Sequence, residues 1–184
     1  MRGINNRNIL DTFCIKFCSV VDKHCKYIIV SGFLAISSGR ARATEDIDMI
    51  IERLDFERFK KLHNDLIKNE FVCMQSDSAK EIFSYLIDKT AVRYTLKDEP
   101  LPEMEIKFAK DQLDDLQIRG RIKLSLTGLD VWFSNININV AFKEELLKSD
   151  KDLKDAEHLR KIYPEMISED EINKIKKMIK ELRL

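Results

Sequence analysis

The chain has 184 residues, which is enough to bury a sizeable core in one domain with an appendage. Its 32 basic and 32 acidic residues give a net charge of zero, so the overall charge indicates neither nucleic acid nor an acidic membrane as a partner. No apolar run approaches the ~20 residues that span a bilayer. Arg2, Arg7 and Asp11 interrupt any secretory signal, so we expect a cytoplasmic protein.

The spacing of apolar residues in the first half of the chain predicts alternating helices and strands. In chain order, the predicted elements are a helix over 8–24, a strand over 27–31, a short helix over 33–38, a strand over 46–51, a helix from Asp55 to about Asn69, a strand over 71–74, a helix over 78–88, a strand over 91–96 and an alternating strand over 103–108. Residues 97–102 contain Pro100 and Pro102 and are predicted to form a loop.

The later part of the chain is predicted to turn from strands to helices. Residues 110–120 give no clear pattern, and residues 122–126 and 129–133 are strand candidates. From about residue 137 every pattern is helical, with one stop before Pro164.

The last helix begins with a recognisable cap, because Ser168 and Glu171 form the capping-box pattern. The order of elements predicts an α/β (α+β) core over residues 1–135 and a C-terminal helical subdomain over 136–184.

Cysteines and histidines give no sign of a metal centre or a catalytic pair. The four cysteines, at 14, 18, 25 and 73, match no zinc-binding spacing, so we expect reduced and buried thiols. The three histidines, at 24, 63 and 158, have no partner that the sequence identifies, so surface or structural roles are expected.

The strand over 46–51 carries two acids at its start. Asp46 and Asp48 are two residues apart, so both side chains point to one face of the strand while Ile47 and Met49 point into the core. Two acids beside a buried strand are costly unless a cation holds them, and magnesium suits such hard oxygen ligands. The alternative is a strand edge with ordinary solvated acids.

The segment around these acids resembles a known family. Gly32, a short helix, Arg40, Arg42, Thr44 and then Asp46-Ile47-Asp48 between apolar flanks are similar to the signature of the nucleotidyltransferase superfamily. The resemblance is closest to its small prokaryotic branch, which includes abortive-infection toxins and minimal nucleotidyltransferases. It is sharp over 27–51, weaker over 151–155, and elsewhere extends only to the order of strands.

The resemblance implies a mixed sheet flanked by helices, and a site for Mg²⁺ (or Mn²⁺) held by three carboxylates. Asp46 and Asp48 supply two of them, and a later strand supplies the third. Glu105 is the expected third ligand, with Glu103 in reserve and Asp130 as a poorer candidate. The alternative for Glu105 is a solvated acid paired with Lys107 or with a neighbouring strand.

The nucleotide is expected to contact the turn and loop before the acids. Gly32 at a helix start offers free N–H groups to a phosphate, although a plain tight turn is the alternative. Arg40 and Arg42 suit phosphate oxygens, or else they are surface charges or pair with Glu45. Phe33 departs from the family, because it stands where a second small residue is usual and so narrows the expected pocket.

The C-terminal helices are expected to close over the nucleotide. By resemblance, Lys151 lies near the phosphates, with Lys143 and Asp155 on the same helical segment, although a solvated helix face is the alternative for each. Ser149 departs from the family pattern, which often has an arginine there.

These features predict a nucleotidyltransferase that moves a nucleoside monophosphate from a nucleoside triphosphate to a protein or RNA hydroxyl and releases pyrophosphate. The alternative is a non-catalytic module of the same fold that binds a nucleotide or acts as an antitoxin-type partner. Phe33 and Ser149 favour this second function. A helical protein partner, as in a toxin–antitoxin pair, or a homodimer is compatible with either.

Overall fold

The computed structural model describes residues 8–41 and 43–184. Its helices are α1 (Ile9–Val21), α2 (Ser31–Ser37), α3 (Phe56–Lys68), α4 (Ala79–Ile87), α5 (Gln112–Arg119), α6 (Ile136–Phe142), α7 (Asp150–Ile162) and α8 (Glu169–Arg183). Its strands are β1 (Tyr27–Val30), β2 (Asp46–Ile51), β3 (Phe71–Cys73), β4 (Val92–Leu96) and β5 (Glu99–Phe108). A π-helical turn (Lys143–Leu147) continues α6, and 3₁₀ turns lie at Ser125–Thr127 and Pro164–Met166.

The five strands form one mixed sheet in the order β1-β2-β5-β4-β3. Only β2 and β5 are parallel, and the other neighbouring pairs are antiparallel. The predicted fold class, a mixed sheet flanked by helices with helices at the C-terminal end, is confirmed.

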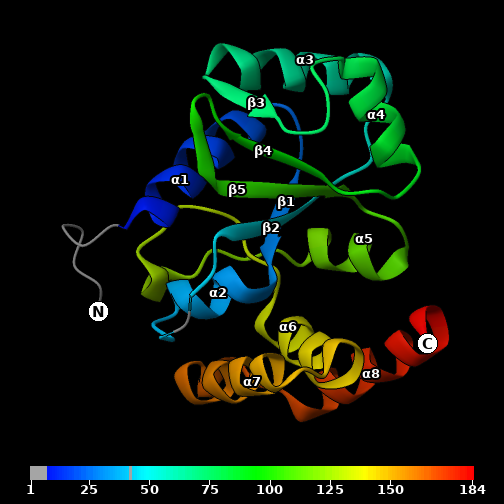
Figure 1. Cartoon of the computed structure of the whole chain (residues 1–184). Helices are drawn as coiled ribbons and strands as arrows, with labels where there is room; N and C mark the ends of the chain where they lie inside the picture. Colours follow the sequence, from blue (N-terminus) through cyan, green and yellow to red (C-terminus); the bar gives the residue numbers. More distant parts are fainter. Residues whose placement is uncertain (1–7, 42) are drawn as a thin grey trace.

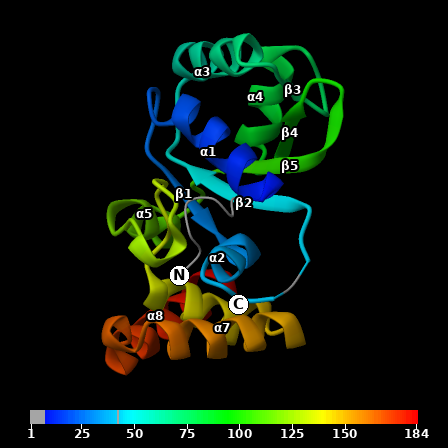
Figure 2. The same ribbon diagram turned by 90° about the vertical axis from the view of Figure 1, so that its left-hand side faces the viewer.

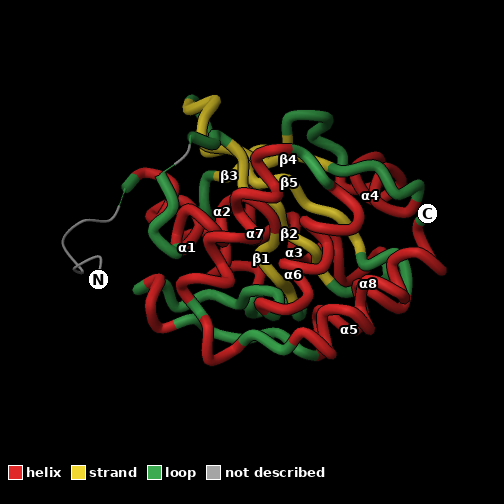
Figure 3. The backbone as a smooth tube through the Cα atoms, turned by 90° about the horizontal axis from the view of Figure 1, so that it is seen from below, coloured by secondary structure: helices red, strands yellow, loops and turns green. Residues whose placement is uncertain are grey.

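The two faces of the sheet have different coverings. Helices α1, α3 and α4 lie on one side of the sheet, and α2, α5 and the C-terminal helices lie on the other (Figure 1, and turned by 90° in Figure 2). The helix α6 packs against both α7 and α8, so these three helices form a layer of their own (Figure 3). The main hydrophobic cluster includes residues of the sheet and of this layer, among them Ile47, Ile136 and Leu159.

The turn from β1 into α2 differs from its prediction. The strand passes directly into the helix through Ser31, which has a left-handed φ of 63°, while Gly32 lies buried in the first turn of α2. A positive φ is uncommon for a residue other than glycine, and here Ser31 takes this conformation while Gly32 does not. The helix ends at Ser37 with Ser38 as its C-cap, and Gly39 follows with a φ of 96°, which suits glycine.

The predicted loop over 97–102 is wrong. Only Lys97 and Asp98 form a turn, and β5 begins at Glu99, opposite Leu96 of β4. The strand β2 starts at Asp46, opposite Glu103, so residues 99–102 extend beyond it. On that side, residues 99–102 have no neighbouring strand to which their N–H groups could donate. Proline lacks an N–H group and is therefore tolerated there.

The region between β5 and α6 also departs from the prediction. Residues 112–119 form α5, which Asp111 caps by accepting hydrogen bonds from the backbone N–H groups of Leu113 and Asp114. The strand candidates over 122–126 and 129–133 form only isolated bridges that join Phe133 to Ile29 and to Ile122. Within the described part of the chain, no helix is long and apolar enough to cross a membrane.

Candidate active site

The acids of β2 lie on one face of the sheet and the apolar residues between them on the other, as the alternation predicted. Ile47 and Met49 are at most 1% exposed on the opposite face, whereas Asp46 and Asp48 are partly exposed. The Thr44 hydroxyl donates a 2.6 Å hydrogen bond to Asp46 Oδ1 and also bonds the Asp46 carbonyl oxygen at 3.2 Å. These two bonds hold the loop before β2 to the first residue of the strand.

The neighbouring strand places two more acids beside them. In the parallel register, Asp46 lies opposite Glu103 and Asp48 lies opposite Glu105. We call Asp46, Asp48 and Glu105 the acid cluster. Because β2 and β5 are adjacent and in register, three carboxylates from two strands share one face.

Glu105 already has two cationic partners. Arg93 Nη2 on β4 lies 3.0 Å from Glu105 Oε2, and Lys107 Nζ lies 2.5 Å from Glu105 Oε1. Arg93 also reaches Glu103, with 3.4 Å between Nε and Oε1. The structure therefore places Glu105 beside Asp48, but in the ion-paired state that was the alternative to a metal ligand.

The negative charge of Asp48 is disfavoured where it lies. Burial raises the pKa of its carboxyl above the usual 3.8, and the charges of Glu105 and Asp46 raise it further. The charge of Lys107 and a hydrogen bond with Ser31 act in the opposite direction without cancelling the rise. Its negative charge is thus disfavoured in this position unless another cation joins it.

The acid cluster supplies the oxygen donors that a divalent cation prefers. The uncompensated charge of Asp48 beside Asp46 fits two positions of such a site. Over residues 8–41 and 43–184, however, no group of three or more His, Cys, Asp or Glu side chains is arranged to hold a metal ion. Glu105 would have to exchange its cationic partners for the ion.

A cavity of about 380 Å³ opens next to Asp48, between the sheet and the C-terminal helices. Its apolar wall is formed by Val30, Ile50, Phe108, Phe142, Leu146 and Leu147. Its basic side chains are Lys89, Lys107, Lys110, Lys143 and Arg183. Asp48 and Asp114 are its acids, so the lining carries an excess of positive charge. An apolar wall with basic groups suits a ligand that combines a flat apolar part with phosphates.

The basic side chains of this cavity differ in whether they already form ion pairs within the protein. Arg183 at the end of α8 bonds Asp111 and Asp114, at distances of 2.7 and 2.8 Å. Lys107 pairs with Glu105, whereas Lys89 and Lys110 are exposed and form no ion pair with any described residue. The last two are therefore the readiest to meet an anionic ligand.

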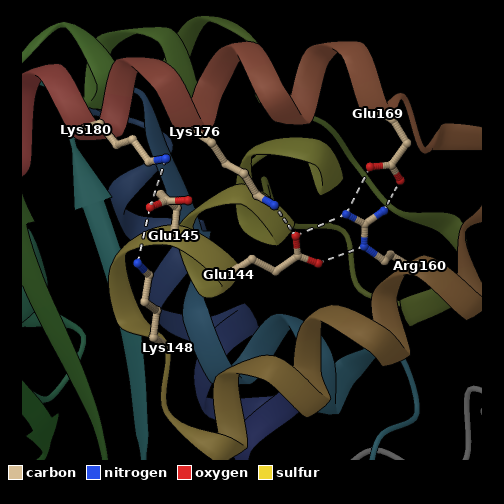
Figure 4. Close-up of polar contacts among 7 residues, drawn as sticks. All are labelled: Glu144, Glu145, Lys148, Arg160, Glu169, Lys176 and Lys180. Atoms are coloured by element: carbon tan, nitrogen blue, oxygen red, sulfur yellow. Dashed lines mark hydrogen bonds and ion pairs between the residues drawn. The ribbon is translucent and has the colours of Figure 1, made fainter.

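Lys143 enters the cavity wall from the π-helical turn. It is 1% exposed, and its Nζ lies 2.9 Å from Asp155 Oδ2 and 3.3 Å from Asp152 Oδ1 on α7. Glu144 and Glu145 of the same turn face α7 and α8 (Figure 4). Arg160 bonds both oxygens of Glu144, and Lys176 of α8 lies 2.6 Å from it. The turn that carries Lys143 is therefore held on two sides.

The residues expected to bind the nucleotide are not gathered around the cavity. Gly32 and Phe33 are buried in α2, and the Phe33 side chain packs in the main core instead of narrowing the cavity. Arg40 forms an ion pair with the buried Asp155 and donates a hydrogen bond to the Lys151 carbonyl, so it joins the loop after α2 to α7. The Lys151 side chain is exposed and is not among the cavity residues, and Arg42 lies outside the described residues.

The remaining candidates have structural partners. Asp130 is exposed and pairs with Lys123, away from the acid cluster. All four cysteines are free and buried, as expected. The three histidines bond, respectively, Asp65 (His24), the Tyr94 hydroxyl (His63) and the Ser38 carbonyl (His158), which agrees with structural roles.

Two of the basic groups around the cavity could be predicted from the sequence. Lys143 belongs to the helical segment that was expected to close over the nucleotide, and Lys107 follows Glu105 by two residues and so shares its face of β5. Lys89, Lys110 and Arg183 come from three distant parts of the chain, and only the fold brings them together.

The arrangement of the sheet and of the helical layers is similar to that of several solved structures. Fifteen solved chains match the structure. One is the solution structure of the antibiotic-resistance factor ANT(2'')-Ia, with a TM-score of 0.58 and 12% sequence identity over 94% of this chain and 91% of that one. Another is an antigenic nucleotidyltransferase-like protein from Paracoccidioides brasiliensis, with a TM-score of 0.56 and 18% identity over 94% of this chain and 88% of that one.

A crystal structure of ANT(2'')-Ia in complex with adenylyl-2''-tobramycin gives a TM-score of 0.55 and 16% identity, covering 95% of this chain and 98% of that one. No protein-family model and no curated protein sequence matches the chain. At these identities the similarity is one of fold.

Proposed function

We propose that the protein is a nucleotidyltransferase, which moves a nucleoside monophosphate from a nucleoside triphosphate to a hydroxyl of a protein or RNA acceptor and releases pyrophosphate. In this reaction the acceptor oxygen forms a bond to the α-phosphorus, and the bond from that phosphorus to the pyrophosphate oxygen breaks. The proton of the hydroxyl passes to a carboxylate of the acid cluster.

The observation that carries this proposal is the position of Asp48. It belongs to two paired strands that present three carboxylates on one face, and it also lines the cavity with its apolar wall and basic side chains. An acid that is desolvated beside other acids is costly for folding, and a cationic ligand bound to it would offset that cost. The nucleotidyltransferase fold is consistent with this use.

The cavity offers separate contacts to the parts of a nucleotide. Phe142 and Leu146 provide an apolar surface for the base, while Lys89 and Lys110 provide charge for phosphate oxygens. Asp46 and Asp48, with Glu105, would hold Mg²⁺ or Mn²⁺, and the bound ion would stabilise the negative charge that develops on the reacting oxygens.

The experiment that tests the proposal measures pyrophosphate release and labelled product with each of the four nucleoside triphosphates and Mg²⁺. Loss of the Asp48 carboxylate removes several kcal/mol of charge stabilisation, so Asp48→Asn is expected to lower turnover by roughly 10³-fold. Asp130→Asn is the matched control, because Asp130 is exposed and pairs only with Lys123 among the described residues. Equal activity of Asp48→Asn and the control would contradict the proposal.

The second candidate function is a non-catalytic module that binds a nucleotide or a protein partner. The ion pairs of Glu105 with Arg93 and Lys107 favour it, because they occupy the third carboxylate. Nucleotide binding that Lys110→Gln weakens, without turnover of any of the four nucleotides, is the result expected from such a module.

A further inference from the structure

Lys107 lies where the third carboxylate of the acid cluster meets the cavity. It follows Glu105 by two residues on β5, so both side chains project from the same face of the sheet. Its Nζ is 2.5 Å from Glu105 Oε1, and Lys107 lines the cavity together with Asp48. One ammonium group therefore stands beside two of the three carboxylates.

The charge of Lys107 reaches Asp48 as well as Glu105. After burial, Lys107 has the largest influence on the pKa of Asp48, which it lowers. A single positive charge that relieves two neighbouring acids does in the free protein what a divalent cation would do there. Two cations at one place repel each other, so Lys107 and a metal ion compete for these carboxylates.

The lysine is also free to leave. Its side chain is 48% exposed beside the cavity, and Glu105 is its one ion-pair partner among the described residues. A lysine is a flexible point charge, unlike the Arg93 fork that reaches both Glu103 and Glu105. Displacing Lys107 from Glu105 therefore breaks one short ion pair and disturbs no buried packing.

We propose that Lys107 is an internal competitor of the divalent cation, whose ammonium group takes the place of the metal beside Glu105 and Asp48 and thereby sets the metal affinity of the site. This inference rests on the proposed function, because it takes the acid cluster to be the metal site. It makes Lys107 a positioning residue that acts through Glu105.

The test is Mn²⁺ binding to the nucleotide-free protein, followed by the loss of the electron paramagnetic resonance signal of free Mn²⁺. Lys107→Gln removes the competing charge and is expected to bind Mn²⁺ about tenfold more tightly than the wild type. Lys107→Arg keeps the charge and is expected to match the wild type within about twofold.

Lys110→Gln is the matched control, because Lys110 lines the same cavity and has no carboxylate partner among the described side chains. A gain for Lys110→Gln equal to that of Lys107→Gln would overturn the proposal, since it would reflect the general charge of the cavity. An unchanged or weaker Mn²⁺ affinity in Lys107→Gln, or no binding by any variant, would overturn it too.

The assay separates this inference from the proposed function. Tighter Mn²⁺ binding in Lys107→Gln without nucleotide turnover in the wild type supports the competition and contradicts the transferase. Turnover that depends on Asp48, with Mn²⁺ affinity independent of Lys107, supports the transferase and contradicts the competition.

Discussion

The acids of the sheet and those of the π-helical turn differ in whether the protein stabilises their negative charge. On the sheet, the pKa of Asp48 is raised, because burial and the neighbouring acids outweigh Lys107 and Ser31. In the π-helical turn, burial also disfavours the charge of Glu144, but hydrogen bonds from Arg160 and Lys176 outweigh it and lower the pKa (Figure 4). Burial raises the pKa of both acids, so the cations beside each acid decide whether its pKa ends above or below the usual value.

This difference separates a structural cluster from a candidate ligand site. Glu144 has its cations within the chain, so its charge stabilises the junction of α7 and α8 with the turn. Asp48 is left short of positive charge at the edge of an open cavity, so a charged ligand would improve its environment. An acid whose charge the fold leaves uncompensated is more informative about function than an acid with cationic partners in the same chain.

The largest expected effect comes from Lys143, the buried lysine that joins the π-helical turn to α7. Lys143→Met is expected to lower the free energy of unfolding by about 3–5 kcal/mol, because it leaves the buried Asp155 and its neighbour Asp152 without this partner. Urea denaturation measures the loss. Lys148→Met, on the same turn but 53% exposed, is the control and is expected to keep the midpoint of the wild type.

A smaller loss is expected from the compensated acid itself. Glu144→Gln removes the charge that Arg160 and Lys176 share, at a cost of about 1 kcal/mol for a half-buried pair. Thermal unfolding with Glu169→Gln as the control checks this, because the exposed Glu169 bonds only Arg160 in Figure 4. If Glu144→Gln lowered the free energy of unfolding as much as Lys143→Met, the ion pairs of Glu144 would contribute more to stability than expected here.

The smallest effect is in the pH dependence of stability, where the two acids should differ in sign. Asp48 has a folded-state pKa above 3.8, so the folded protein holds a proton that the unfolded chain releases, and stability rises as pH falls through that interval. Glu144 has a folded-state pKa below 4.5, so its contribution is complete above that value and is lost as pH falls through the folded pKa.

The measurement is the urea midpoint from pH 7 to about pH 3 for the wild type, Asp48→Asn and Glu144→Gln. The wild type should gain stability relative to Asp48→Asn, and lose it relative to Glu144→Gln, as the pH falls. Two difference curves of the same sign would refute the contrast between the clusters.

Local rules were enough to predict the acids but not their neighbours. The shared face of Asp46 and Asp48 follows from strand alternation alone, and the structure confirms it. The partner of Arg40 could not be predicted in this way, because Asp155 is 115 positions further along the chain and becomes its neighbour only when α7 packs on α2.

The helix α5 shows why a charged segment is hard to interpret from sequence. Its first turn holds Asp114, an acid that is 3% exposed and would normally argue against a packed helix. The partner that makes this burial tolerable is Arg183, 69 residues later. The N-cap Asp111 was a local signal that would have placed the helix start.

The position of Arg183 at the C-terminal end of α8 affects how the protein should be tagged for purification. Its guanidinium group joins α8 to α5 and forms part of the cavity wall, only one residue before Leu184. A purification tag fused behind Leu184 would begin one residue after Arg183, which lines the cavity. Affinity handles for the experiments above belong at the other end of the polypeptide, or should be cleaved before assay.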